Sequence, residues 1–404
     1  MGVNGDGTNF GAGFTALEGV ARDGAGNLYV VDSNAIRKIA PSGTNWIVTT
    51  IAGFYLSHGA GNDGTIVNAR FNNPQGAAVD AAGNVYVADC YDNSIRKVAP
   101  IGTNWVVTTI AGATSMSYGS NDGTNNAARF HNPYGIAADS SGALYVADML
   151  NHTIRKVAPM GTNWVVTTLA GFPGASGTVD GIGTNAHFKS PFGIAVDNNG
   201  VLYIADLAAN TIRKITPVGA DWVVTTLAGT DGVAGSTDGM GAAARFNLPQ
   251  GIAVDAAHNL FVADSDNQTI RRITPAGNVT TIAGLAGVKG SANGIGSAVR
   301  FDAPYWVAAD SAGKLYVTEY GGDGSGGGYT VRQGQVAPFL QIAKVNNQVV
   351  LSWAEELTGF VPQVCYSLPS PSWHTLLDIP SVSDGSWVVT NAMQPGPNFY
   401  RLFK

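Results

Sequence analysis

One short segment returns along the chain at nearly constant spacing, and this periodicity constrains the fold more than any other feature. The segment reads glycine, a small aliphatic residue, alanine, valine or alanine, and aspartate, as in Gly193–Asp197. Its aspartates, counting variant copies that begin at Gly19 and Trp306, are Asp23, Asp80, Asp139, Asp197, Asp255 and Asp310. Successive aspartates lie 57, 59, 58, 58 and 55 residues apart. Self-similarity of this kind predicts a repeat architecture in which each copy is one structural unit.

Each copy reads as four short strands joined by turns. In the copy around Asp80, the segments Gly76–Asp80 and Val85–Asp89 are apolar on both faces, and Ser94–Val98 alternates more. Trp105–Ile110 is rich in the β-branched residues that strands prefer. Four-stranded meanders repeated radially make propeller blades, so six copies predict an all-β, six-bladed β-propeller.

Three motifs of each copy resemble the NHL repeat. In the second copy they are Pro74–Asp80 (Pro-Gln-Gly-Ala-Ala-Val-Asp), Val85–Asp89 (Val-Tyr-Val-Ala-Asp) and Asn93–Lys97 (Asn-Ser-Ile-Arg-Lys). The resemblance covers residues 15–338, and we assign the propeller to residues 1–338. For function the resemblance implies little, because NHL and related propellers include binding scaffolds, RNA binders and a few enzymes.

Composition and charge narrow the classes of partner. The chain has 53 glycines and only 12% charged residues, which fits many turns and few long charged helices. The net charge of −6 argues against nucleic acid, because phosphate binding needs a basic surface. No apolar run approaches the roughly 20 residues that cross a bilayer, so no membrane span is expected. Cys90 and Cys365 lie in different segments and are expected to be free thiols.

The sixth copy has three recognisable strands where the others have four. They are Trp306–Asp310, Leu315–Thr318 and a segment around Tyr329–Gln333. The chain start, Asn4–Thr8, matches the connector Asn62–Thr65, which comes just after a fourth strand. We therefore expect the sixth blade to lack its own outer strand, and the natural precursor to supply one from before residue 1. The alternative is that Phe339–Val345 fills the gap, since an open edge is an aggregation hazard.

From residue 339 the repeat stops and another strand pattern begins. Its strand-like segments are Gln348–Trp353, Phe360–Cys365, Trp373–Leu377, Ser386–Thr390 and Phe399–Leu402. Five or six strands in this length predict a small β-sandwich over residues 339–404. It resembles the fibronectin-III-like modules at the C-terminus of secreted bacterial repeat proteins. We expect Trp353, Trp373 and Tyr400 in its core.

Blade topology predicts which loops share a face. In an antiparallel meander, the second-to-third loop and the blade-to-blade connector emerge on one face, and the tight turns emerge on the other. The variable residues concentrate in the first set, at Phe54–His58, Ala113–Tyr118, Cys90–Asp92, Met149–His152 and Ser265–Gln268. Repeat proteins favour variable loops for binding, so we expect recognition on this face.

The residue before the glycine that opens each inner strand should ring the mouth of the central channel. Around the six blades these residues are Glu18, Gln75, Tyr134, Phe192, Gln250 and Tyr305. The ring joins polar side chains to aromatic ones, which suits a protein, peptide or carbohydrate ligand. The alternative is that these side chains only fill the axis.

Two series of carboxylates recur in every blade and are assigned structural roles, because a catalytic residue needs to occur only once. The second series lies nine residues after the first, at Asp32, Asp89, Asp148, Asp206, Asp264 and Glu319. We predict hydrogen-bonding anchors partnered by a third-strand arginine such as Arg96. Asp-Gly connectors such as Asp63–Gly64 are interpreted as Asx-type turns, because a calcium site gathers several oxygen ligands and each connector brings one carboxylate.

No catalytic residue, cofactor or metal site is predicted. The amidating-lyase propellers, which resemble NHL repeats, need several channel histidines for zinc, and the six histidines here fall in loops and turns. Lactonase-type propellers hold a divalent cation on Glu, Asn and Asp at the channel mouth. Glu18 occupies a comparable position, but its ring partners are glutamines and aromatic residues.

Three hypotheses for function follow. The first is a non-enzymatic binding or scaffold propeller, located outside the cell or in the cell envelope in its native form, although the chain as given begins without a signal-peptide pattern. The second is a metal-dependent hydrolase or lyase with Glu18 in the channel. The third is a structural envelope or filament component, either a monomer or assembled through the open sixth blade.

Overall fold

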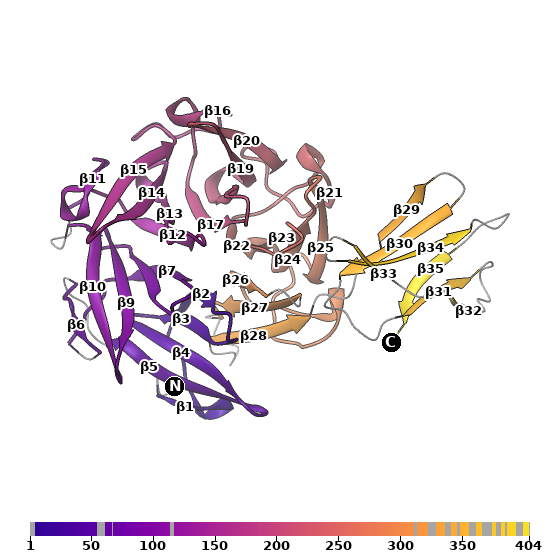
Figure 1. Cartoon of the computed structure of the whole chain (residues 1–404), viewed down its shortest axis with the longest axis horizontal. Coiled ribbons are helices and arrows are strands. Elements are labelled where there is room, and N and C mark those ends of the chain that lie inside the picture. Colours follow the sequence, from indigo (N-terminus) through magenta and orange to yellow (C-terminus); the bar gives the residue numbers. More distant parts are fainter. Residues whose placement is uncertain are drawn as a thin grey trace. The chain divides into compact units, whose positions relative to one another are not determined.

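The chain folds into two separate units. The computed structural model describes residues 5–54, 61–66, 68–113, 117–310, 313–321, 329–335, 341–345, 348–354, 361–365, 374–376, 381–383, 386–392 and 399–403. One unit comprises residues 1–310 with 315–334, and the other comprises residues 311–314 with 335–404. The first unit holds six antiparallel sheets arranged around an axis (Figure 1). The predicted all-β, six-bladed propeller is therefore confirmed, and the predicted boundary after residue 338 stays a prediction.

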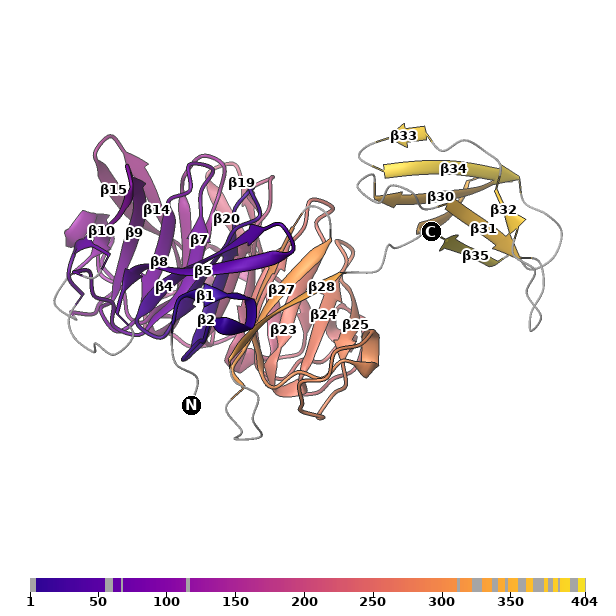
Figure 2. The same ribbon diagram turned by 90° about the horizontal axis from the view of Figure 1, so that it is seen from below.

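Within each blade the strands run outward from the axis in sequence order (Figures 1 and 2). The inner strands are β2 Leu17–Arg22, β7 Pro74–Val79, β12 Pro133–Ala138, β17 Pro191–Val196, β22 Pro249–Val254 and β26 Pro304–Ala309. The second strands are β3 Leu28–Asp32, β8 Val85–Asp89, β13 Leu144–Asp148, β18 Leu202–Asp206, β23 Leu260–Asp264 and β27 Lys314–Glu319. The third strands are β4 Ala35–Ser42, β9 Ser94–Ile101, β14 Thr153–Met160, β19 Thr211–Val218, β24 Thr269–Ile273 and β28 Thr330–Gln335. The fourth strands are β5 Asn45–Gly53, β10 Asn104–Gly112, β15 Asn163–Ala170, β20 Asp221–Gly229 and β25 Asn278–Gly284.

Five blades have one strand more than predicted. Two residues of the connector that leads into each of these blades pair antiparallel with its fourth strand. They are β1 Gly7–Thr8, β6 Gly64–Thr65, β11 Gly123–Thr124, β16 Gly181–Ile182 and β21 Gly239–Met240. The prediction of four-stranded blades missed this short fifth strand, because two paired residues leave no periodic pattern in a sequence.

Helical structure in the described residues is confined to single 3₁₀ turns. They are η1 Asn9–Gly11, η2 Asn125–Ala127, η3 Met149–Asn151, η4 Gly183–Asn185, η5 Leu207–Ala209, η6 Gly241–Ala243, η7 Ser265–Asn267 and η8 Gly296–Ala298. None of the helices in this part of the chain has the length and hydropathy of a membrane span.

The sixth blade is a sheet of three strands, β26, β27 and β28, within the described residues. This agrees with the expected absence of its own outer strand. The proposed substitute, Phe339–Val345, does not take that place: β29 Gln341–Val345 pairs instead with β30 Gln348–Ala354. Phe339 itself lies outside the described residues.

The second unit contains two antiparallel sheets. One has the order β29-β30-β34-β33 and the other has the order β32-β31-β35. The remaining bounds are β31 Val361–Cys365, β32 His374–Thr375, β33 Ser381–Ser383, β34 Ser386–Ala392 and β35 Phe399–Phe403. All five predicted strand segments contain a strand. β29 lies within Phe339–Val345, which was considered only as an outer strand of blade six, and β33 was not predicted. Tyr400 is half-buried, whereas the side chains of Trp353, Trp373 and Cys365 lie outside the described residues.

Apolar side chains of neighbouring blades pack together around the ring. Between blades two and three, for example, Ile95 and Ile110 meet Leu144 and Val157 in one buried cluster. A tryptophan early in a fourth strand contacts, edge to face, a tyrosine of the preceding blade's second strand. These pairs are Trp105–Tyr29, Trp164–Tyr86, Trp222–Tyr145 and Trp46–Tyr316. The same aromatic contact therefore fixes the stacking at four blade interfaces.

The inner strands approach one another so closely that they require glycine. A β-carbon on Gly76 would overlap the carbonyl of Tyr134, and one on Gly135 would overlap the carbonyl of Phe192. The repeated glycine thus sets how tightly five of the inner strands gather at the axis. Blade six carries Trp306 at this position, and Trp306 is buried.

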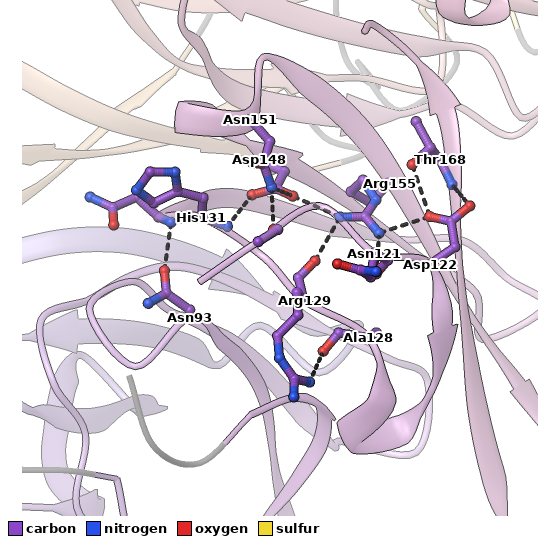
Figure 3. Close-up of polar contacts among 12 residues, drawn as sticks. Asn93, Asn121, Asp122, Ala128, Arg129, His131, Asp148, Asn151, Arg155 and Thr168 are labelled. Atoms are coloured by element: carbon purple, nitrogen blue, oxygen red, sulfur yellow. Dashed lines mark hydrogen bonds and ion pairs between the residues drawn. The ribbon is translucent and has the colours of Figure 1, made fainter. Parts of the chain in front are cut away.

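A buried arginine of the third strand ties each blade to the connector that enters it (Figure 3). In blade three, Arg155 donates hydrogen bonds to Asp148 Oδ2 and to Asp122 Oδ1, both at 2.8 Å. It also donates to the Arg129 carbonyl, and its guanidinium carbon lies 5.1 Å from the Phe130 ring centroid. Asp148 ends the second strand, whereas the other partners belong to the connector. The arginine therefore holds the connector against the sheet.

The same arrangement recurs around the ring. The buried ion pairs are Arg37–Asp32, Arg96–Asp89, Arg155–Asp148, Arg213–Asp206 and Arg271–Asp264. In blade six the half-buried Arg332 pairs with Glu319. The predicted anchoring of the second acid series by arginine is confirmed. The first series differs, because Asp80 accepts hydrogen bonds from Asn84 and Tyr86 instead.

The Asp-Gly connectors do more than the predicted turn. Asp63 accepts a hydrogen bond from Arg96 and another from Thr109 of the fourth strand. Asp122 does the same with Arg155 and Thr168. Each connector carboxylate therefore joins the third strand to the fourth, and the Asx-turn interpretation misses this role.

We expect Arg155→Met to lower the free energy of unfolding by about 3–5 kcal/mol, because the substitution leaves the Asp148 carboxylate buried without its cation. The matched control is Lys156→Met on the neighbouring, half-buried residue of the same strand, which should cost less than about 1 kcal/mol. Urea unfolding followed by circular dichroism at pH 7 measures both. Equal losses in the two variants would contradict the assigned role.

Candidate functional site

The six residues predicted to ring the channel mouth come together at one end of the axis. Each is the second residue of its inner strand. The rings of Tyr134 and Phe192 lie 4.6 Å apart between centroids, and those of Phe192 and Tyr305 lie 5.7 Å apart. Tyr305 Oη donates a hydrogen bond to Gln75 Oε1 at 3.1 Å. Because blades two, four and six are not neighbours, the contacts of Tyr305 with Phe192 and with Gln75 cross the axis, and these side chains occupy it.

Glu18 is the one ionisable carboxylate among these six residues, and it is buried. Glu18 is only 8% exposed, and its Oε2 atom has no hydrogen-bond partner in the described structure. Burial raises the pKa of Glu18 to about 8, and a hydrogen bond with Tyr305 opposes that rise. At neutral pH the carboxyl is therefore mostly protonated, so the filled axis is close to uncharged.

Two further polar groups near the axis are enclosed. The side-chain oxygen of Gln250 is buried without a hydrogen-bond partner among the described residues. Cys90, which follows the second strand of blade two, is a fully buried free thiol and shares a hydrogen bond with Tyr134. Burial raises the pKa of the Cys90 thiol, which keeps it protonated. The predicted free thiol is confirmed for Cys90, and its low thiolate content makes it a poor nucleophile.

An aromatic cluster continues from the axis toward blade six. We use this name for Tyr134, Phe192, Tyr305, Trp306, Tyr320 and Tyr329. Tyr320 lies 5.8 Å from Tyr305 and 5.7 Å from Tyr329 between ring centroids. Tyr320 is 46% exposed, so the cluster extends from buried rings to the surface.

Sequence reasoning missed Tyr320 and Tyr329. Tyr320 directly follows Glu319, so it begins the second-to-third loop of blade six, the type of loop in which variable residues concentrate in the other blades. The sequence could have pointed to Tyr320, because an aromatic residue stands at the start of a loop of the variable type. Tyr91, at the same loop of blade two, is 51% exposed. Met149 and Leu207, from blades three and four, pack against the buried apolar core that includes Phe192 and Trp306. Of the other predicted loop segments, residues 55–60 and 114–116 lie outside the described residues.

Among the described residues, no group of three or more His, Cys, Asp or Glu side chains lies close enough together to hold a metal ion. His152 occupies a left-handed backbone position, and its Nδ1 lies 2.8 Å from the carbonyl oxygen of Lys189. That contact joins blade three to the connector entering blade four, which agrees with a structural role for His152.

Two stretches of the chain match a known repeat family. Residues 71–98 and 246–273 match the NHL repeat. The chain carries NHL repeats. These stretches run from the end of a connector into the third strand of blades two and five, so they contain the arginine and its buried aspartate.

Whole proteins that resemble the chain are 16–30% identical to it in the comparisons below. The chain is 30% identical over 275 residues to SUPPRESSOR OF QUENCHING 1 of Arabidopsis thaliana, covering 52% of the chain and 26% of that relative. A Bacteroides thetaiotaomicron protein of unknown function has a TM-score of 0.59 at 21% identity, covering 79% of this chain and 70% of that one. A gluconolactonase of Xanthomonas campestris has a TM-score of 0.50 at 16% identity, covering 76% and 84% respectively. These structures share the fold, and the chain spans about a quarter of that curated relative.

The buried Glu18 predicts a pH-dependent stability with a definite sign. Between its ordinary pKa of 4.5 and its folded pKa of about 8, the unfolded chain loses this proton while the folded chain keeps it. The free energy of unfolding should therefore fall as pH rises through this range. Glu18→Gln resembles the protonated side chain and cannot ionise. We expect it to match the wild type near pH 4 and to exceed its stability by a few kcal/mol at pH 9.

Thermal and urea unfolding at several pH values between 4 and 9 measure this difference. The control is Asp266→Asn, at an exposed residue, which should leave the shape of the pH profile unchanged. Parallel profiles of the wild type and Glu18→Gln would show that Glu18 is not protonated in the folded protein.

Proposed function

We propose that this chain is a non-enzymatic binding propeller that recognises an uncharged segment of a peptide or carbohydrate over the aromatic cluster. The observation that carries the proposal is the position of Tyr320. It is half-exposed on the face of the connectors and second-to-third loops, and it contacts Tyr305, which is itself packed into the axis. An exposed ring supported by buried rings is held in place before a ligand arrives.

The physical argument concerns rigidity and charge. Aromatic side chains offer large apolar areas with few rotatable bonds, so they lose little conformational entropy when a ligand covers them. Beneath the exposed ring, the protonated Glu18 and the amides of Gln75 and Gln250 are polar but leave the region without net charge. This combination favours a stacked sugar ring or an uncharged peptide segment over an ionic ligand.

Two accompanying proposals concern the rest of the chain. We propose that residues 339–404 form a fibronectin-III-like module, supported by the two antiparallel sheets of the second unit. We also propose that the native protein works outside the cell or in the cell envelope. Fractionation of cells that express the native gene tests that location.

Replacing the exposed rings should weaken binding without unfolding the propeller. Labelled protein is first screened on glycan and peptide arrays, and the affinity for the strongest ligand is then measured by calorimetry. We expect Tyr320→Ala combined with Tyr91→Ala to reduce affinity by about tenfold or more, as loss of aromatic contact residues commonly does. The matched control is Met160→Ala, an exposed apolar residue that ends β14 beside a tight turn of the opposite face. Unchanged affinity in the tyrosine variant would contradict the proposed surface.

A metal-dependent hydrolase or lyase is the second candidate, and one observation favours it. Glu18 has a strongly raised pKa, and Glu18 and Gln250, both of the channel-mouth series, each have a side-chain oxygen without a described hydrogen-bond partner. Perturbed carboxyl groups of this kind are frequent in active sites. If the candidate is right, purified protein should carry about one divalent ion per chain, and Glu18→Gln should remove it together with any lactonase or lyase turnover. Mass spectrometry of the metal content decides between the two candidates.

A further inference from the structure

Blade three differs from its neighbours at two positions of the connector that enters it. In each of blades three to six, a glycine of this connector donates its main-chain N–H to the carbonyl of a phenylalanine, as in Gly119–Phe130, Gly177–Phe188, Gly235–Phe246 and Gly290–Phe301. The residue before each glycine and the residue after each phenylalanine therefore correspond from blade to blade. These two residues are, in turn, Tyr118 and His131, Ser176 and Lys189, Ala234 and Asn247, and Lys289 and Asp302.

The contact between the two positions changes its character around the ring. In blade six, Lys289 and Asp302 form an ion pair at 3.4 Å. In blade three, the rings of Tyr118 and His131 stack, with their centroids 4.3 Å apart and their planes 18° from parallel. The place that holds a charge pair in blade six thus holds a flat aromatic surface in blade three.

Tyr118 presents the free side of this stack to solvent. It is 67% exposed, and because His131 covers one face of its ring, the exposed area includes the other face. His131 is half-buried, and its main-chain N–H donates a hydrogen bond to Asp148 Oδ1 at 2.7 Å (Figure 3). Burial and the nearby His152 lower the pKa of His131, so its ring is neutral at pH 7. The exposed ring is therefore supported by an anchored, uncharged partner.

Two more apolar residues are exposed beside this stack. Leu150 is 39% exposed, and its N–H donates to the carbonyl of His131 at 3.1 Å. Phe172 is 55% exposed and begins a turn whose third residue, Gly174, donates to the carbonyl of Asn151 at 3.3 Å. The corresponding residues are Ala208 and Thr230 in blade four, and Asp266 and Leu285 in blade five.

Tyr118, His131, Leu150 and Phe172 are called the blade-three platform below. The platform carries no charge at neutral pH, and it shares no residue with the aromatic cluster. Blade four differs, because Lys189 replaces the histidine and forms an ion pair with Asp231 at 2.6 Å. A contact that the fold requires recurs in each blade, whereas this combination of residues occurs once among blades three to six. Its single occurrence is what a binding site requires.

We propose that the blade-three platform is a carbohydrate-binding site that stacks a neutral pyranose ring on Tyr118. A pyranose with mostly equatorial hydroxyl groups has an apolar face of ring C–H groups, and a flat exposed aromatic ring covers such a face without bringing charge to it. Leu150 and Phe172 supply further apolar surface for neighbouring sugars of the same chain. The stack holds Tyr118 in place before the ligand arrives, which lowers the entropy cost of binding.

The main-chain groups around the platform favour a sugar over an extended peptide. The N–H groups of Gly119, Leu150 and Gly174 donate within the protein, to the carbonyls of Phe130, His131 and Asn151 respectively. A peptide that adds as a strand needs free main-chain groups of this kind. Recognition at the platform therefore depends on side chains, and stacking against a ring is the contact that Tyr118 offers.

The test titrates the full chain with three β-1,4-linked hexasaccharides, composed of glucose, mannose or xylose, and follows binding by NMR. We expect at least one of them to bind saturably with a Kd of about 1 mM or lower, with saturation transfer strongest at its ring C–H protons. Tyr118→Ala should weaken binding at least about tenfold, and Tyr118→Phe, which keeps the ring, should stay within about threefold of the wild type. The matched control is Val233→Ala, at an exposed apolar residue of the connector that enters blade five, and it should bind as the wild type does.

The experiment also separates the platform from the aromatic cluster. Loss of binding in Tyr118→Ala, with full binding in the variant that combines Tyr320→Ala and Tyr91→Ala, supports the platform whether or not the cluster binds another ligand. The opposite result overturns the platform and favours recognition over the cluster. The proposal is also overturned if none of the three sugars binds at about 10 mM. Decaproline bound at Tyr118 in their place would overturn it as well, because the occupant would then be a peptide.

Discussion

The buried guanidinium of the third strand is the interaction on which the ring depends. A connector leaves the outer strand of one blade and must deliver the chain to the axis for the next inner strand. Arg155 and its counterparts bind that connector through a carboxylate and main-chain carbonyls while pairing with an aspartate of the sheet. Buried ion pairs contribute little net stability once desolvation is counted. The importance of this one therefore lies in geometry, because the rigid fork of five donors fixes where each connector crosses its blade.

Fixed connectors have a consequence at the axis. They bring the inner strands so close that glycine is needed at the contact, and the residue before each glycine then has no space except the axis itself. Side chains from blades two, four and six meet there, and Glu18 is enclosed among them. The low charge of this region thus follows from packing, since burial keeps the carboxyl protonated. Among the rings connected to this filled region, Tyr320 is the one that reaches the surface, at 46% exposed, which is why the proposed function places recognition there.

Periodicity explains what could be predicted from the sequence and what could not. Every element that repeats was predictable: the blades, the four main strands, the acid that meets Arg96 and the incomplete sixth blade. The two-residue strand Gly64–Thr65 is too short to leave a pattern. The hydrogen bond between Gln75 and Tyr305 joins residues 230 positions apart, and no local sequence signal reports such a contact. The burial of Glu18 likewise depends on side chains from several other blades converging on it.

Blade six shows that the contact between the third-strand arginine and the connector does not require a fourth strand. Elsewhere the connector carboxylate bonds both the arginine and a fourth-strand threonine, so the two contacts support each other. In blade six the connector residue is Asn293, and Arg332 holds it while Glu319 balances the charge. The connector of blade six is therefore held in place although no described fourth strand pairs with β28. Along the outer edge of β28, which no described strand covers, Arg332 and Gln333 place polar groups that discourage unspecific pairing.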